Sequence, residues 1–148
     1  MYTAYAIAAY IYNKYQQNFA DIIPEMKLHK LLYYVQRESY IQIDEPLFVE
    51  PFYAYKFGPV MLSIRDDYKK KQFEPVDISP EAERIVETVF ARYGTTQPWS
   101  LAMMSHEEIS WQNARINVPP SENGMHIMLN NDIKKDANRI KQIRSHTD

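Results

Sequence analysis

His106, Glu107 and Glu108 are the residues of this chain whose types first suggest chemistry. A zinc hydrolase helix of the HExxH type needs a second histidine four residues after the first, so that both imidazoles face one metal ion. Serine occupies that position here, at Ser110, and the other three histidines are isolated in the sequence. We therefore expect no metal site. A hydrolase built around His106 and Glu108 stays a hypothesis beside the simpler one, a surface or capping role for His106.

Other catalytic patterns are missing from the sequence. There is no cysteine, hence no thiolate nucleophile and no disulfide, and there is no GxSxG elbow or glycine-rich phosphate loop. Asp66 and Asp67 are neighbours, so their carboxylates diverge on a helix, whereas acid–base pairs usually converge from separate elements. We expect a protein that is not an enzyme and that uses no cofactor.

Trp111 and Arg115 have the spacing of a joint binding anchor. Residues four apart on a helix share a face, so the guanidinium can stack on the indole ring. Tryptophan and arginine are also frequent among the residues that dominate binding energy at protein interfaces. The alternative is that Trp111 fills the core and Arg115 tethers an internal carboxylate. The sequence leaves both interpretations open.

Tyrosines are concentrated near the N-terminus, with 8 of the 12 in the first forty residues. A tyrosine has a large apolar body and one polar tip, which suits half-buried positions and protein interfaces. Tyr5 and Tyr12 are our candidate contacts with a partner protein. The alternative is that these rings close the core of a small helical domain.

Five basic residues between positions 134 and 144 raise the question of nucleic-acid binding. Each could neutralise a phosphate. However, Asp132 and Asp136 interrupt the run, no aromatic platform accompanies it, and the net charge of the chain is −2. A solvated amphipathic helix is favoured, and it would also suit an acidic protein groove.

Length and composition describe an ordinary globular protein. The chain has 148 residues, 45% hydrophobic and 24% charged, which fits one domain. No apolar stretch reaches the roughly 18 residues that span a bilayer. The apolar N-terminal segment lacks the basic start and cleavage site of a signal peptide. With no cysteine, we expect a soluble, cytoplasmic protein that does not associate with membranes.

Hydrophobic periodicity predicts mainly helices. Ser79 is a good N-cap and Gly94 a helix stop, while the aromatic run Leu47–Phe57 contains proline and is extended or edge-strand-like. Pro59 follows a glycine hinge and can open a helix. We expect a mostly α, single compact domain of about six helices with one short extended or edge-strand segment. The predicted helices cover residues 3–16, 24–42, 59–70, 79–93, 98–106 and 131–145, with a turn at 111–116.

Three segments, Lys27–Gln36, Ala54–Val60 and His106–Arg115, together resemble one family. It is the SocA-like or Panacea antitoxin domain, also known as phage-associated GepA-like. The resemblance covers nearly the full chain, which implies a single domain of residues 1–148. The residues that match the family pattern are, in the first segment, Lys27, Leu28, Lys30, Leu31, Leu32, Tyr33, Tyr34 and Gln36. In and before the second segment they are Pro46, Leu47, Phe48, Ala54, Tyr55, Gly58, Pro59 and Val60. In the third they are His106, Glu108, Trp111, Ala114 and Arg115.

Four positions depart from the family pattern, and they bear on partner choice. His29 stands where glutamine is usual, Arg37 where a small residue often occurs, Ser105 in place of threonine and Ser110 in place of proline. These changes are local and leave the fold assignment intact. In a family that pairs with diverse toxins, they mean that the shared motifs do not identify a partner.

The resemblance implies an antitoxin that binds a cognate protein toxin and neutralises it, often encoded in a prophage. At least one relative acts as an adaptor that delivers its toxin to the ClpXP protease, so neutralisation is either direct or through proteolysis. For such a function our candidate contacts are Tyr5, Tyr12, Trp111 and Arg115. The alternative function is a nucleic-acid-binding regulator that uses the basic C-terminal helix.

Overall fold

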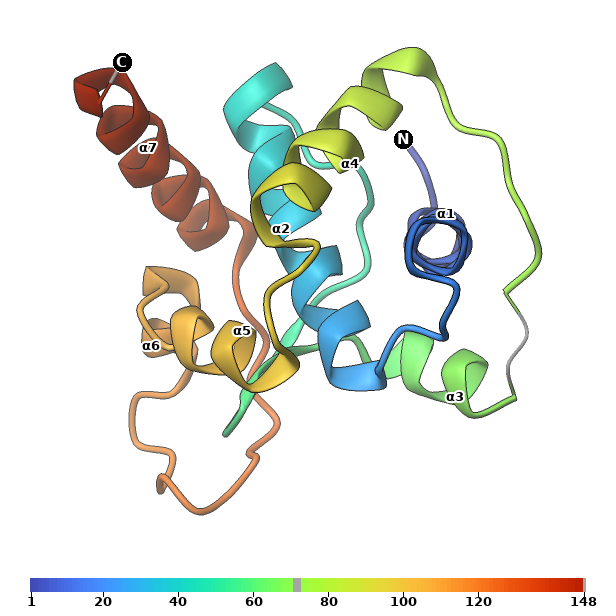
Figure 1. Cartoon of the computed structure of the whole chain (residues 1–148). Coiled ribbons are helices and arrows are strands. Elements are labelled where there is room, and N and C mark those ends of the chain that lie inside the picture. The colour runs from blue at the N-terminus through green and yellow to red at the C-terminus, as the bar shows by residue number, and fades with distance from the viewer. Residues whose placement is uncertain (71–72, 148) are drawn as a thin grey trace.

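Seven helices and one β-hairpin form the part of the chain that the structure, a computed structural model, describes: residues 1–70 and 73–147 (Figure 1). The mostly helical fold predicted from the sequence is confirmed. The elements in chain order are α1 (Ala4–Phe19), α2 (Glu25–Ile43), β1 (Tyr53–Tyr55), β2 (Gly58–Val60), α3 (Leu62–Lys70), α4 (Pro80–Tyr93), α5 (Pro98–Ser105), α6 (Ile109–Ala114) and α7 (Asn130–Thr147).

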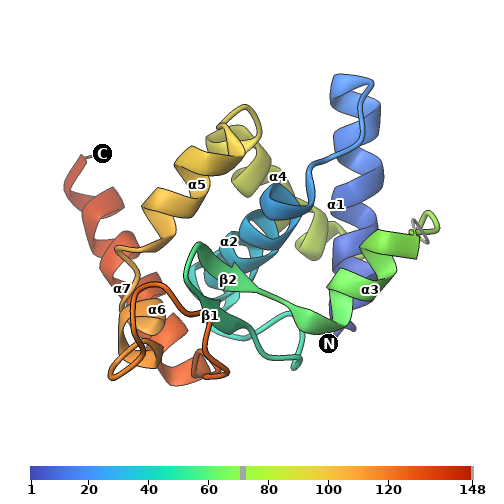
Figure 2. The same ribbon diagram turned by 90° about the horizontal axis from the view of Figure 1, so that it is seen from below.

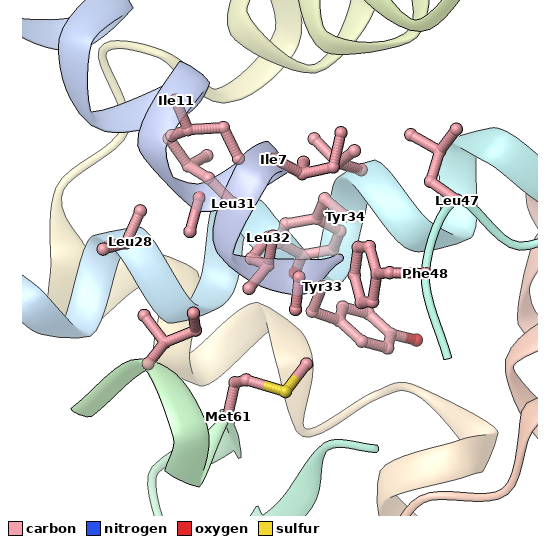
Figure 3. Packing of buried hydrophobic residues seen from close by; sticks show 14 of the residues in the cluster. Ile7, Ile11, Leu28, Leu31, Leu32, Tyr33, Tyr34, Leu47, Phe48 and Met61 are labelled. Atoms are coloured by element: carbon pink, nitrogen blue, oxygen red, sulfur yellow. The ribbon is translucent and has the colours of Figure 1, made fainter. Parts of the chain in front are cut away.

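Helix α2 lies at the centre, and most other elements pack on it. Every residue from position 27 to 39 is buried, and α2 contacts α1, α4, α5, α7 and the hairpin strand β2. Figure 3 shows Ile7 and Ile11 of α1 beside α2, with Phe48 close to Tyr33. One hydrophobic cluster runs from Ala4 to Ile133, so elements from both ends of the chain share the same core.

The helix ends have local causes. Ser79 caps α4 as predicted, its Oγ accepting a hydrogen bond from the Ala82 N–H at 3.2 Å. α1 runs to Phe19, beyond the predicted residue 16, and stops at Ala20, which has a left-handed φ of 54°. Gly94 follows α4 as expected, although its φ of −57° is right-handed, so the freedom of glycine to adopt positive φ is not used there.

The prediction that Pro59 opens a helix is wrong. Pro59 lies in β2, where it pairs with Ala54 of β1 in an antiparallel hairpin, and α3 begins only at Leu62. Gly58 has a φ of 107°, a conformation open to glycine, and this turns the chain back instead of into a helix. The ladder is three residues long, so the missing N–H of proline costs little.

The remaining differences concern the C-terminal half. The predicted turn at 111–116 is the short helix α6, which raises the number of described helices from about six to seven. α7 extends from residue 130 to 147, slightly longer than predicted. No helix in the described ranges is both long and apolar enough to cross a membrane.

Candidate partner-binding surface

The β-hairpin is held in place by a buried lysine. Lys30 of α2 is 2% exposed, and its Nζ donates a hydrogen bond to the Pro59 carbonyl oxygen at 3.0 Å. A Cβ on Gly58 would lie 2.7 Å from Lys30 Cε and 2.3 Å from Ser105 Oγ of α5. Only glycine fits so close an approach. α2, the hairpin and α5 therefore meet at this point, where Figure 2 shows the hairpin crossing α2 between α6 and α3.

A pocket of about 350 Å³ lies between α2, α3 and the hairpin. We call it the Lys30 pocket. It combines aromatic walls with charge, and its cations outnumber its acids. The aromatic and charged residues that line it are Tyr55, Phe57, Lys30, Lys56, Arg65 and Glu25.

The hydrogen bonds of His29, which also lines this pocket, show which of its ring nitrogens carries the proton. Its Nδ1 accepts a hydrogen bond from the Met61 N–H at 3.2 Å, so the ring proton is on Nε2, which lies 3.0 Å from Glu25 Oε2. Burial lowers the pKa of His29, although Glu25 opposes this. Burial also lowers the pKa of Lys30, to about 7. At neutral pH His29 is therefore uncharged and Lys30 only partly protonated.

Large apolar side chains are exposed next to the pocket. Phe57 of the hairpin turn is 42% exposed, Trp99 of α5 54% and Met103 41%. The Phe57 and Trp99 rings form an edge-to-face pair with centroids 5.2 Å apart, and Met103 lies one turn after Trp99 on the same helix. We call these three residues the hairpin–α5 surface.

The contacts predicted from the sequence do not include this surface, although the sequence carries a signal for it. The segment Pro98–Ser105 is apolar on all sides, and a helix of that kind at the edge of a small domain cannot bury every face. It buries Leu101 and Ala102 and leaves Trp99 in water. The sequence did not reveal which face would be exposed.

Trp111 and Arg115 do lie together, as their spacing predicts. Arg115 Cζ is 5.6 Å from the centroid of the Trp111 ring, and the His106 ring also stacks on Trp111, with centroids 4.2 Å apart. Both residues are half-buried. Trp111 Nε1 donates a hydrogen bond to the Tyr55 carbonyl oxygen at 2.8 Å. This group therefore braces the hairpin.

Arg115 is an internal tether, but to carbonyl groups. Its guanidinium donates hydrogen bonds to the carbonyl oxygens of Ala54 at 3.0 Å, Asn123 at 2.8 Å and Pro119 at 3.0 Å. These contacts tie the loop after α6 to β1. The carboxylate partner predicted as an alternative for Arg115 is not among these three acceptors.

Tyr5 and Tyr12 lie away from the hairpin, on α1, which is on the other side of α2 from α5 in both views (Figures 1 and 2). Both are half-buried and pack on Phe73, at centroid distances of 5.7 Å and 4.8 Å. The Tyr5 hydroxyl accepts a hydrogen bond from the Glu74 N–H at 3.2 Å. These rings hold the segment before α4 against α1, and their role as partner contacts stays a prediction.

His106 and Glu108 face different surroundings. Glu108 is 2% exposed and pairs with Arg37 of α2 and Arg139 of α7, the latter at 3.3 Å. Burial raises the pKa of Glu108 to about 7, although Arg37 opposes the rise, so the carboxylate is ionised above neutral pH. His106 is half-buried and stacks on Trp111 instead. These contacts give no support to a shared site of the two residues, and the hydrolase stays a hypothesis.

Ion pairs occupy most of the basic residues of α7. Arg139 pairs with Glu108 and Arg144 with Glu38, at 3.3 Å and 2.9 Å. The remaining pairs join Lys134 to Asp44 and Lys135 to Asp132, at 3.2 Å and 3.6 Å. Four of the five basic residues noted in the sequence thus have carboxylate partners, and Lys141 is exposed.

Fold and surface together define a small helical protein whose hairpin and α5 expose an aromatic surface beside a cationic pocket. The family model described as the antitoxin SocA-like, Panacea domain matches residues 28–112, more than half of the chain. The chain therefore belongs to the SocA-like antitoxin family, and the predicted resemblance is confirmed. α1 and α7 lie outside the matched segment and pack on α2 within it. Comparisons with curated proteins and with solved structures found no match.

Proposed function

We propose that this protein is the antitoxin of a toxin–antitoxin pair, which binds its cognate protein toxin in the cytoplasm and neutralises it. It acts by binding and not by catalysis. Family membership supports the antitoxin role. The observation that carries the choice of binding surface is the exposed aromatic pair of Phe57 and Trp99.

The hairpin–α5 surface suits protein binding for three reasons. Tryptophan is among the residues most often found at the energetic centre of interfaces. Methionine adapts its shape to a partner, which fits Met103. The hairpin that presents Phe57 is fixed by Lys30 and Trp111, so little conformational freedom is lost on binding.

The four contacts proposed from the sequence divide into two groups under this proposal. Trp111 and Arg115 support the hairpin and contribute through its position. Tyr5 and Tyr12 form a separate, second candidate region on α1. Replacing Tyr5, Tyr12 or Trp111 with alanine should weaken toxin binding by about 1–4 kcal/mol if that residue is an energetic centre of the interface.

Co-expression tests the proposed function directly. Each neighbouring open reading frame that is toxic alone is expressed with and without this protein, and growth and co-purification are scored. Rescue with a co-purified complex supports an antitoxin that binds its toxin. Absence of rescue for every toxic neighbour would contradict the proposed function.

Two routes to neutralisation are compatible with the proposal, and the host distinguishes them. A direct inhibitor rescues growth equally in hosts with and without ClpXP. An adaptor that delivers the toxin to a ClpXP-type protease rescues only where the protease is present, and the toxin level falls in that host alone.

The contacts of α7 do not favour the alternative function, a nucleic-acid-binding regulator. Four of its basic residues are already paired with carboxylates, and phosphate contacts would have to displace these partners. We expect no gel shift of operator DNA by the antitoxin alone, even at low salt. A salt-dependent shift that is lost on replacing Lys134 and Lys141 would favour the alternative.

A further inference from the structure

Lys30 is a buried cation with few partners. An ammonium group can donate three hydrogen bonds, and within residues 1–70 and 73–147 the structure gives Lys30 one acceptor, the Pro59 carbonyl oxygen. The acid nearest in the pocket lining is Glu25, which is engaged by His29 at 3.0 Å and by Arg65 at 3.5 Å. Lys30 therefore lacks a carboxylate of its own.

This arrangement lowers the stability of the fold. A buried charge without a counter-ion destabilises a protein, and an apolar side chain of similar size would fit the same space without that cost. The low pKa of Lys30 reflects the same cost. Nevertheless the hairpin is shaped around the Lys30 side chain, since Gly58 leaves room for Lys30 Cε.

Two further basic residues line the pocket besides Lys30. Lys56 lies over the Phe57 ring at 5.2 Å and Arg65 over the Tyr55 ring at 6.0 Å. Both cations line the pocket with Lys30. An anion that enters would thus meet Lys56, Arg65 and, in its protonated form, Lys30. Phe57 joins the pocket directly to the hairpin–α5 surface.

We propose that the Lys30 pocket receives a carboxylate of the partner protein, an Asp or Glu side chain or a C-terminal carboxylate, that pairs with Lys30. An apolar side chain of the same partner segment then packs on Phe57 and Trp99. This inference rests on the proposed function, because it specifies what kind of toxin segment the surface accepts.

The ion pair predicts a pH dependence of binding. A carboxylate beside Lys30 stabilises the ammonium, so binding takes up a proton and weakens as the pH rises from 7 to 9. The other charged residues that line the pocket are Lys56, Arg65 and Glu25. The hydrogen bond with His29 lowers the pKa of Glu25, so that carboxylate does not titrate over this range. Burial lowers the pKa of both His29 and His106, so neither titrates there.

The test uses the full-length antitoxin and the toxin recovered by co-expression. Lys30→Met keeps the length of the side chain and removes its charge. Lys141→Met, at an exposed position of α7, is the matched control. We expect Lys30→Met to weaken toxin binding by about tenfold or more and to abolish the pH dependence. Lys141→Met should bind like the wild type. Unchanged affinity and pH profile in Lys30→Met, while Trp99→Ala weakens binding, would overturn the pocket proposal and leave the proposed function standing.

A second measurement tests whether the Lys30 pocket binds a carboxylate if no toxin is found. In protein with ¹³C-labelled lysines, sodium acetate is the probe and sodium chloride at equal ionic strength is the control. An acetate-specific shift of the Lys30 ε-carbon signal, with a raised Lys30 pKa and no such change at Lys141, supports a carboxylate site. Identical titrations in acetate and chloride would overturn it.

Discussion

Lys30 and Gly58 constrain each other at the level of single atoms. The Lys30 side chain runs beneath the hairpin, and the absence of a Cβ on Gly58 makes that path possible. The positive φ of Gly58 turns the chain at the same position. Lys30 and Gly58 therefore both contribute to where Phe57 is presented.

Gly58→Ala should destabilise the protein by about 2–4 kcal/mol, because the added methyl group meets strained backbone and two close neighbours. Urea unfolding measures this loss. Ser105→Ala removes the nearest atom, 2.3 Å from the added Cβ, so the double variant should recover part of the loss. Fully additive effects of the two substitutions would contradict the steric explanation.

Lys30→Met should stabilise the free protein by about 1–4 kcal/mol at pH 7. The pKa of Lys30 is about 7 in the native state and 10.5 in the unfolded chain, so the unfolded chain binds more protons between these values. Lys30 therefore contributes a rise in stability with pH from about 7 to about 10. Thermal unfolding across this range should show a flatter profile for Lys30→Met. A lower stability of Lys30→Met at pH 7 would show that Lys30 serves the fold.

Helices α2, α6 and α7 are joined by a buried ionic network. Glu108, which precedes α6, contacts Arg37 of α2 and Arg139 of α7. Asp136 of α7 accepts hydrogen bonds from the Tyr33 hydroxyl at 3.0 Å and the Ser110 Oγ at 2.6 Å. These bonds fix α6, and with it Trp111, against the central helix.

Glu108→Gln should cost about 3–5 kcal/mol of stability at pH 8, because it leaves the Arg37 guanidinium buried without its carboxylate. Chemical denaturation measures the change. Lys134→Ala is the control, since the pair of Lys134 with Asp44 is exposed and worth about 1 kcal/mol at most. Equal effects of the two substitutions would contradict a structural role for the buried network.

The sequence predicted the elements whose signals are local. The apolar stripe of α2 and the Ser79 cap of α4 each depend on a few adjacent residues, and both predictions were close. The hairpin was missed because Gly58-Pro59 also suits a helix start, and what decides between them is a contact from Lys30, 29 residues away. Trp111 and Arg115 were paired correctly by spacing, whereas the exposure of Trp99 depends on how α5 packs.

At the scale of the whole molecule, the helices that complete the core and the surface proposed to bind the toxin lie on different faces. α1 and α7 lie outside the segment that matches the family model. Both add residues to the core, and Arg144 of α7 pairs with the buried Glu38 of α2. The face formed by the hairpin and α5 keeps aromatic side chains and a cationic pocket exposed to solvent. This separation is what we expect of a protein that binds a partner through one surface.

The most direct test of this proposal is the affinity of the cognate toxin for three folded forms of the protein, measured by calorimetry. These forms are the wild type, Trp99→Ala on the hairpin–α5 surface, and Ile143→Ala, which alters another exposed apolar residue, 48% exposed on α7. We expect Trp99→Ala to weaken binding by at least about tenfold and Ile143→Ala to bind like the wild type. Wild-type affinity in Trp99→Ala would contradict the proposed binding surface and direct attention to Tyr5 and Tyr12.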